Sequence, residues 1–135
     1  MRAFVSDQSS SFISKVIGGP PDRTVVASLD LPPGTWVVFA TVALAGNAGL
    51  GTAVSVQMIF QLGGQIYGEE VQCNFTITDI SNVVSGFQVV PLMTGLVLDT
   101  PKTLQIACVA TPANSAASQP TTITAVEVGS LTRIT

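Results

Sequence analysis

The sequence predicts an all-β domain, either a sandwich or a barrel, from three observations. Short runs of β-branched, aromatic and small residues recur along the chain and are separated by turns that contain glycine or proline. Several runs alternate apolar with polar residues, which is the period of a strand with one buried face. No stretch has the spacing and capping residues of a convincing helix. We expect seven or eight strands joined by short turns.

Composition indicates a protein that lives in an assembly. The 135 residues fit one domain; 47% of them are hydrophobic and 10% are charged, against about 25% charged residues in soluble proteins. A monomer with so few charges would expose large apolar patches, which usually mark contact surfaces. The net charge of −3 comes from scattered residues with no basic run, so nucleic acid and membranes are not expected partners.

The chain has neither the apolar core of a signal peptide nor an apolar run of the about 18 residues that span a bilayer. We therefore expect a protein that is made in a cytoplasm without a signal peptide. If such a protein leaves the cell, it does so by lysis, as part of a particle or by an unrecognised route.

Residues 1–23 are polar and loosely patterned, and we expect them to form an arm ahead of a domain over residues 24–135. A flexible terminus is the simpler interpretation. The alternative is an arm that docks on a neighbouring subunit or anchors the domain to a larger particle. The candidate anchoring contacts are the apolar residues Phe4, Phe12, Ile13 and Ile17.

A strand over residues 24–31 is followed by residues 31–44, around which the domain is organised. Pro33 presets φ for one central turn position and Gly34 accepts positive φ at the next, which predicts a type II turn. The strand that follows has no charged residue. One face carries Trp36, Val38, Ala40, Val42 and Leu44. The other face, from Val37 to Ala43, is nearly as apolar, so we expect both to be covered, the second by another copy of the chain.

The next strand alternates apolar with polar residues and ends at a Gly-Gly pair, which is typical of a two-residue hairpin turn. Closing the hairpin there pairs Phe60 with Tyr67 and Val56 with Val71, so that core faces meet. A glutamate then falls on the core face, and we therefore expect a bulge near Gly68.

The remaining strands are less regular. Residues 83–98 form a predicted strand that is interrupted at Pro91 and Gly95, so it either bends or lies at an edge, where proline is tolerated. Residues 104–110 and 122–130 complete the domain.

The sequence contains no catalytic constellation. It has no histidine, which removes the commonest general base and the commonest metal ligand. Glu69 and Glu70 are adjacent and point to opposite faces of a strand, so they cannot act as a pair. No stretch has the acidic spacing of a calcium loop. We expect no enzymatic activity, cofactor or metal.

Cys73 and Cys108 both fall on inward faces of predicted strands. Buried cysteines most often behave as small hydrophobic residues. A disulfide between them requires adjacent strands, and the sequence leaves this alternative open.

Three stretches together resemble the jelly-roll domains related to tumour necrosis factor and the complement globular head: residues 31–38, the Gly63-Gly64 hairpin and residues 122–131. In bacteria and phages, similar domains tip collagen-like surface proteins, tail fibres and head fibres. The resemblance covers about residues 24–131 and implies an antiparallel sandwich of about eight strands. It also implies a homotrimer whose inner sheets pack around a three-fold axis. The chain lacks the Gly-x-x repeat or coiled-coil stalk of a fibre tip, and its short N-terminal arm better suits a small decoration or fibre protein on a virion.

These observations lead to the hypothesis of a non-enzymatic, homotrimeric protein on the surface of a phage-like virion, as a decoration, fibre or receptor-binding head. Its arm would contact other capsid or tail proteins. The candidate trimer contacts are Val37, Phe39, Thr41, Val89, Leu92 and Met93.

The alternative hypothesis is a carbohydrate-binding or adhesion module that recognises a host-surface glycan. It would use loops at residues 46–51 and 111–120; the second of these is the loosest stretch of the chain and is predicted to be an exposed tip. The candidate ligand contacts are Asn47, Leu50, Asn114 and Gln119.

Overall fold

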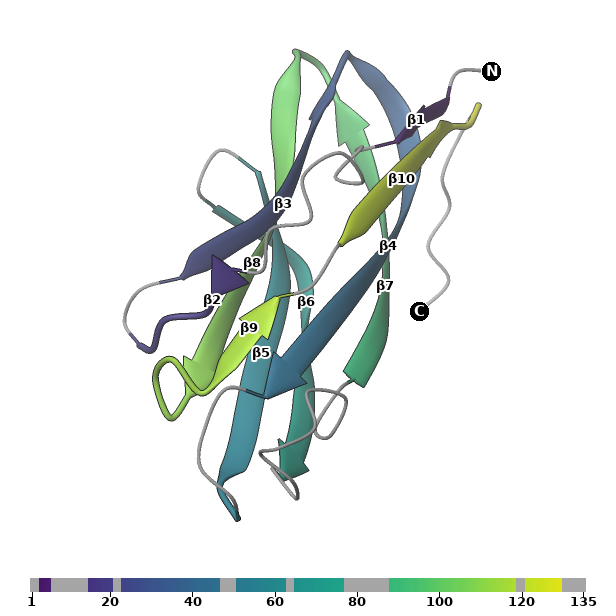
Figure 1. Ribbon diagram of the computed structural model, residues 1–135. Coiled ribbons are helices and arrows are strands. Elements are labelled where there is room, and N and C mark those ends of the chain that lie inside the picture. The colour runs from purple at the N-terminus through teal and green to yellow at the C-terminus, as the bar shows by residue number, and fades with distance from the viewer. Residues whose placement is uncertain are drawn as a thin grey trace.

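The computed structural model describes residues 3–5, 15–20, 23–46, 51–62, 65–76, 88–118 and 121–129. They form ten strands and no helix, arranged as two antiparallel sheets that pack into a sandwich (Figure 1). The first sheet contains β1 (Ala3–Val5), β2 (Lys15–Val16), β4 (Gly34–Gly46), β7 (Gln88–Leu98), β9 (Ala116–Ser118) and β10 (Thr122–Glu127). The second contains β3 (Thr24–Leu31), β5 (Ala53–Leu62), β6 (Gln65–Thr76) and β8 (Lys102–Thr111).

Eight of these strands have the connectivity of a jelly roll. Their order is β1-β10-β4-β7 in the first sheet and β3-β8-β5-β6 in the second. Only β5 and β6 are neighbours both in the chain and in a sheet, because the other connections cross between the two sheets. The predicted jelly-roll sandwich of about eight strands is therefore confirmed. The short strand β9 is added beside β4, and β2 pairs with β9.

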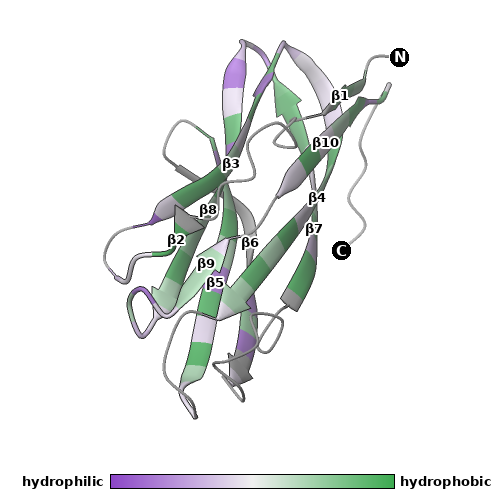
Figure 2. Ribbon diagram, viewed as in Figure 1, coloured by the Kyte–Doolittle hydropathy of each residue, from purple (hydrophilic) through white to green (hydrophobic). Residues whose placement is uncertain are grey.

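The alternation of β4 separates the core from the outside. Its even-numbered side chains, from Trp36 to Leu44, are buried between the sheets. The indole Nε1 of Trp36 donates a 3.1 Å hydrogen bond to the carbonyl oxygen of Pro32. Phe4 packs edge to face against the indole, with ring centroids 5.4 Å apart. Trp36 thus joins the start of β4 to the preceding turn and to β1. Apolar residues predominate along β4 as a whole (Figure 2).

The turn before β4 is not the predicted type II turn. Gly34 has a φ of 153°, whereas a type II turn needs about +80° at this position. Gly34 already pairs with Leu98 as the first residue of β4, so the chain enters the strand directly after Pro33. This φ is still one that glycine adopts more readily than other residues.

β5 and β6 form the predicted hairpin with the predicted bulge. Phe60 lies opposite Tyr67 as expected, but Val56 lies opposite Cys73 rather than Val71. The register shifts just before Phe60, where two steps along β5 match four steps along β6. Side chains alternate with a period of two, so a shift of two residues leaves the core face of β6 unchanged.

β7 lies at the edge of the first sheet, which is one of the two positions predicted from its proline. It pairs with β4 along its whole length and with no other strand among the described residues. The strand runs through Pro91 and Gly95 without a break. Proline has no N–H to donate to a ladder, and it is therefore tolerated at an edge. Of the predicted range, residues 83–87 lie outside the described part of the chain.

The prediction of an exposed loop over residues 111–120 is wrong for residues 115–118. Residues 111–114 are exposed, but the next four are buried. Three of them form β9, which pairs with both β4 and β2. A run of alanine and serine is typical of a loop in composition. Here the small side chains allow β9 to pack closely between β4 and β2.

The segment after β2 holds this region in place through its backbone. Ile17 donates a 2.9 Å hydrogen bond from its N–H to the carbonyl of Ala116, and its own carbonyl accepts one from Asn114 at 3.0 Å. The Gly18 carbonyl accepts a 2.9 Å bond from the N–H of Ala110. At Gly19 the two segments approach so closely that an added Cβ would lie 2.5 Å from the Cβ of Ala113.

The two cysteines are separated by a strand. Cys73 on β6 lies opposite Val56 of β5, and Cys108 on β8 lies opposite Met58 of the same strand. Because β5 runs between their strands, both thiols are free and the disulfide is not formed. Burial raises the pKa of Cys73, and it raises the pKa of Cys108 to about 12 from the ordinary value of 9.0.

A methyl group at Gly19 tests the packing of residues 15–19 against the 110–116 segment. We expect Gly19→Ala to lower the free energy of unfolding by about 1–3 kcal/mol, the usual cost of overpacking. Urea-induced unfolding measures this change. Gly18→Ala is the matched control, because its Cβ would lie 3.6 Å from Thr24 Oγ1, an ordinary contact. Equal stability of the two variants would contradict the close approach.

The raised pKa of the Cys108 thiol predicts lower stability at alkaline pH. The unfolded chain loses the thiol proton near pH 9, whereas the folded chain loses it only near pH 12. The folded state therefore binds more protons between these values, and stability falls as pH rises through this range. The free energy of unfolding in urea should be compared for the native chain and Cys108→Ala at several pH values. The difference between them should be constant below pH 9 and should shrink above pH 9. A difference independent of pH would show that burial does not hold the thiol protonated.

Candidate functional site: the outer face of the first sheet

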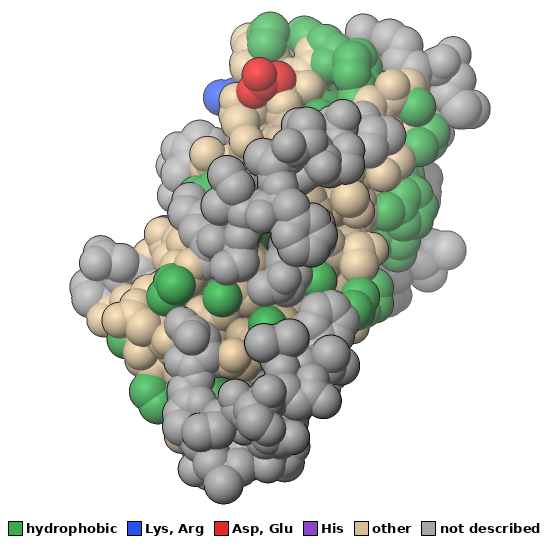
Figure 3. Space-filling model, in the orientation of Figure 1, with side chains coloured by type: hydrophobic (Ala, Val, Ile, Leu, Met, Phe, Trp, Pro, Cys, Tyr) green, Lys and Arg blue, Asp and Glu red, His purple; other side chains and the backbone are tan. Residues whose placement is uncertain are grey.

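The first sheet exposes an apolar surface on the side that faces away from the core. Phe39 of β4 is 48% exposed, and Met93 and Val97 of β7 are 70% and 63% exposed. Val89, near the start of β7, is 53% exposed. We call the outward side chains of β4 and β7 the apolar face; in the space-filling view, hydrophobic side chains lie along the right-hand side of the molecule, over these strands (Figure 3).

Strand register makes this surface continuous. Phe39 lies directly opposite Met93, and the next outward pairs along the ladder are Val37 with Gly95 and Thr41 with Pro91. On the other side of β4, the outward residues of β10 continue the face, with Thr124 opposite Phe39. Cross-strand partners on one face lie about 5 Å apart, so Phe39 and Met93 form the centre of one patch.

The face carries no charge. The outward positions that are described on β4, β7 and β10 hold only apolar residues, threonine and glycine. A soluble surface normally mixes charged groups with apolar ones, whereas the centre of a protein interface is depleted of charge. An exposed apolar patch of this kind is typical of a contact surface.

The structure separates the predicted contact residues into two groups. Phe39, Thr41, Val89 and Met93 point outward and are exposed, and Val37 is half-buried on the same face. Leu92 is 6% exposed and belongs to the hydrophobic core, so its inclusion is corrected.

Val97 is exposed on the same face but was not among the predicted contact residues. Both faces of β7 are apolar, so hydrophobicity alone does not show which residues face outward. Counting by twos from Met93 would have excluded Leu92 and found Val97.

Two of the four predicted anchoring residues contact the chain's own core. Phe4 packs on Trp36, and Ile17 is fully buried. These two side chains are therefore not available to anchor the domain elsewhere. The other two residues, Phe12 and Ile13, lie outside the described residues.

The predicted ligand loops are only partly described. Asn114 is exposed and has a φ of 64°, a conformation that asparagine tolerates better than most residues. Asn47, Leu50 and Gln119 lie outside the described residues.

Within the described ranges, no three histidine, cysteine, aspartate or glutamate side chains are placed to hold a metal ion. No helix in the same ranges is long and apolar enough to cross a membrane.

No protein-family model and no curated protein matches the sequence. Solved structures do match. The tumour necrosis factor Eiger from S. frugiperda is 12% identical, with 98% of this chain and 96% of that chain covered and a TM-score of 0.51. The infectious bursal disease virus Gt strain structure is 10% identical, with 96% of this chain covered and a TM-score of 0.55.

A third match is the VP2 subviral particle of infectious bursal disease virus, at 11% identity over 93% of this chain, with a TM-score of 0.52. The chain spans only about a third of the two viral chains, 32% and 34%. At these identities the comparisons show the fold alone. They agree with the jelly roll of this chain, whose fold is similar to those of the Eiger and infectious bursal disease virus structures.

Proposed function

We propose that the chain is a non-enzymatic structural module that assembles as a homotrimer on the surface of a phage-like particle. The apolar face is the observation that carries this proposal. Water would contact Phe39, Met93, Val89 and Val97 in an isolated chain. Burying such side chains is favourable by about 25 cal/mol for each Å² removed from water.

Another copy of the same chain is the partner that fits this face best. A partner with a charged surface would leave its charges buried without compensation, because the described positions of the face offer none in return. A second apolar face of the same kind has no such cost. The tumour necrosis factor Eiger matches this chain over nearly the whole of both chains. This resemblance implies a three-fold arrangement in which the first sheets of three copies face one another.

The role on a particle is supported by the viral matches. One of them is a structure of a subviral particle, and the jelly roll of this chain matches about a third of its length. Within this proposal the module is a decoration, a fibre or a receptor-binding head. Contacts with capsid or tail proteins would come from the arm, with Phe12 and Ile13 as its remaining candidates.

A lysine at the centre of the apolar face tests the assembly. The native chain should have three times the chain mass by light scattering at low concentration. Phe39→Lys should weaken association by at least about 100-fold, because each copy would bury an unpaired charge at a cost of several kcal/mol. The emission of the buried Trp36 reports whether the variant is still folded.

Gln57→Lys is the matched control, since Gln57 is exposed on the outer face of the second sheet. This variant should remain trimeric. A native chain that is monomeric would contradict the proposed assembly. A folded Phe39→Lys variant that stays trimeric would show that another surface holds the subunits together.

A further inference from the structure

The outer face of the second sheet is polar, and its described charge is the carboxylate of Asp30 on β3, at the opposite edge of the sheet from β6. The described outward side chains of β5, β6 and β8 include no charged residue. Amides and hydroxyls are the polar groups on these three strands, and two pairs of them are joined by short hydrogen bonds. Gln61 Nε2 donates to Gln105 Oε1 at 2.7 Å, and Gln72 Nε2 donates to Ser55 Oγ at 2.6 Å.

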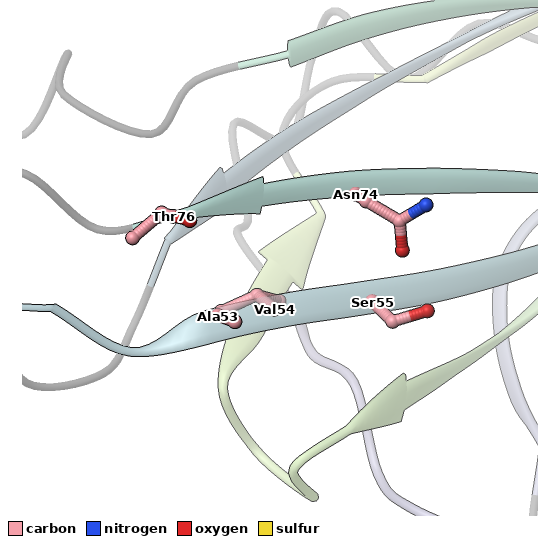
Figure 4. Close-up of a pocket in the computed structure, with 5 residues that line it drawn as sticks. All are labelled: Ala53, Val54, Ser55, Asn74 and Thr76. Carbon is pink, nitrogen blue, oxygen red and sulfur yellow. The ribbon is translucent and has the colours of Figure 1, made fainter.

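A hollow of about 240 Å³ lies between β5 and β6 at one end of this face (Figure 4). It is lined by Ala53, Val54 and Ser55 of β5 and by Asn74 and Thr76 of β6. Strand register places Ser55 opposite Asn74 and Ala53 opposite Thr76. The lining of the hollow therefore offers two hydroxyls and one amide, with the side chain of Ala53 beside them.

The hydrogen bond from Gln72 prepares Ser55 for a ligand. Because Ser55 Oγ accepts the amide hydrogen of Gln72, its own hydroxyl hydrogen is directed to a different acceptor. Asn74 brings both a carbonyl oxygen and an NH₂ group, and Thr76 brings a hydroxyl that donates and accepts. All three are short side chains on paired strands, so a ligand would order few rotatable bonds.

We propose that this hollow binds a neutral sugar residue of a glycan. Sugar hydroxyls donate and accept hydrogen bonds at the same time, and the amide and hydroxyls of the hollow complement both functions. The described lining has no cation for a phosphate or an acidic sugar, and no carboxylate for a metal ion. The volume is below the about 300 Å³ at which pockets for larger ligands begin, which fits one sugar ring.

The site would work independently of the proposed trimer. It lies on the second sheet, whereas the apolar face lies on the first sheet, on the opposite side of the sandwich. Assembly through the apolar face therefore leaves the hollow accessible. A small open site predicts weak binding by one chain, in the millimolar range. In a trimer, three such sites would raise the avidity for a multivalent glycan.

The test is a titration of the isotopically labelled full chain with neutral monosaccharides, followed by amide chemical shifts. We expect glucose, galactose, mannose or N-acetylglucosamine to shift the amides of residues 53–55 and 74–76. Asn74→Ala and Thr76→Val should each weaken binding at least about tenfold. Thr103→Val is the matched control, because Thr103 lies on the same sheet but does not line the hollow. Its Oγ1 donates a 2.6 Å hydrogen bond to Asp30 Oδ1.

Three outcomes would overturn the proposal. No shifts at high millimolar sugar would exclude a site for these ligands. Shifts that map to another surface, or that persist in the Asn74 and Thr76 variants, would place binding elsewhere. A charged sugar that binds more tightly than its neutral counterpart would contradict the chemistry assigned to the lining. Light scattering of the same samples reports the assembly separately, so failure of the sugar site and failure of the trimer are distinguishable.

Discussion

The structure depends on how β4 divides its side chains between two environments. Trp36 and the even-numbered residues after it fill the space between the sheets, and Trp36 also binds the turn before the strand and the ring of Phe4. Once that side is committed to the core, Phe39 must point away from it, because neighbouring residues of a strand face opposite ways. The exposed patch is thus a direct consequence of a strand that is apolar on both faces.

The two outer faces of the sandwich have different chemistry. The first sheet presents apolar side chains and threonine, which favour contact with a similar surface. The second presents amides and hydroxyls, which favour water or a ligand rich in hydroxyl groups. The apolar face and the described outward side chains of β5, β6 and β8 carry no charge, so association at either should depend little on ionic strength. This fits a chain of which only 10% of the residues are charged.

Much of the fold follows from the sequence, because β3, β4 and β5 have strong turn signals and clear patterns. The β5–β6 pairing was predicted up to the bulge, and the two-residue slip beyond it preserved the core face. Reasoning from the sequence failed where its signal was ambiguous. Both faces of β7 are apolar, so Leu92 could not be told from Met93, and the alanines and serines of β9 resemble a loop. The hollow was not predicted, since it depends on the pairing of Ser55 with Asn74 across strands.

Pro91 limits the ways in which copies of this chain can associate. An edge strand with free N–H and C=O groups is a template on which another strand can extend the sheet, and repetition of that step produces open-ended polymers. The pyrrolidine ring leaves a gap in the donors of β7, two residues from the exposed side chain of Met93. Association is thereby directed to side chains that meet face to face, which favours small closed assemblies over fibrils built by strand addition.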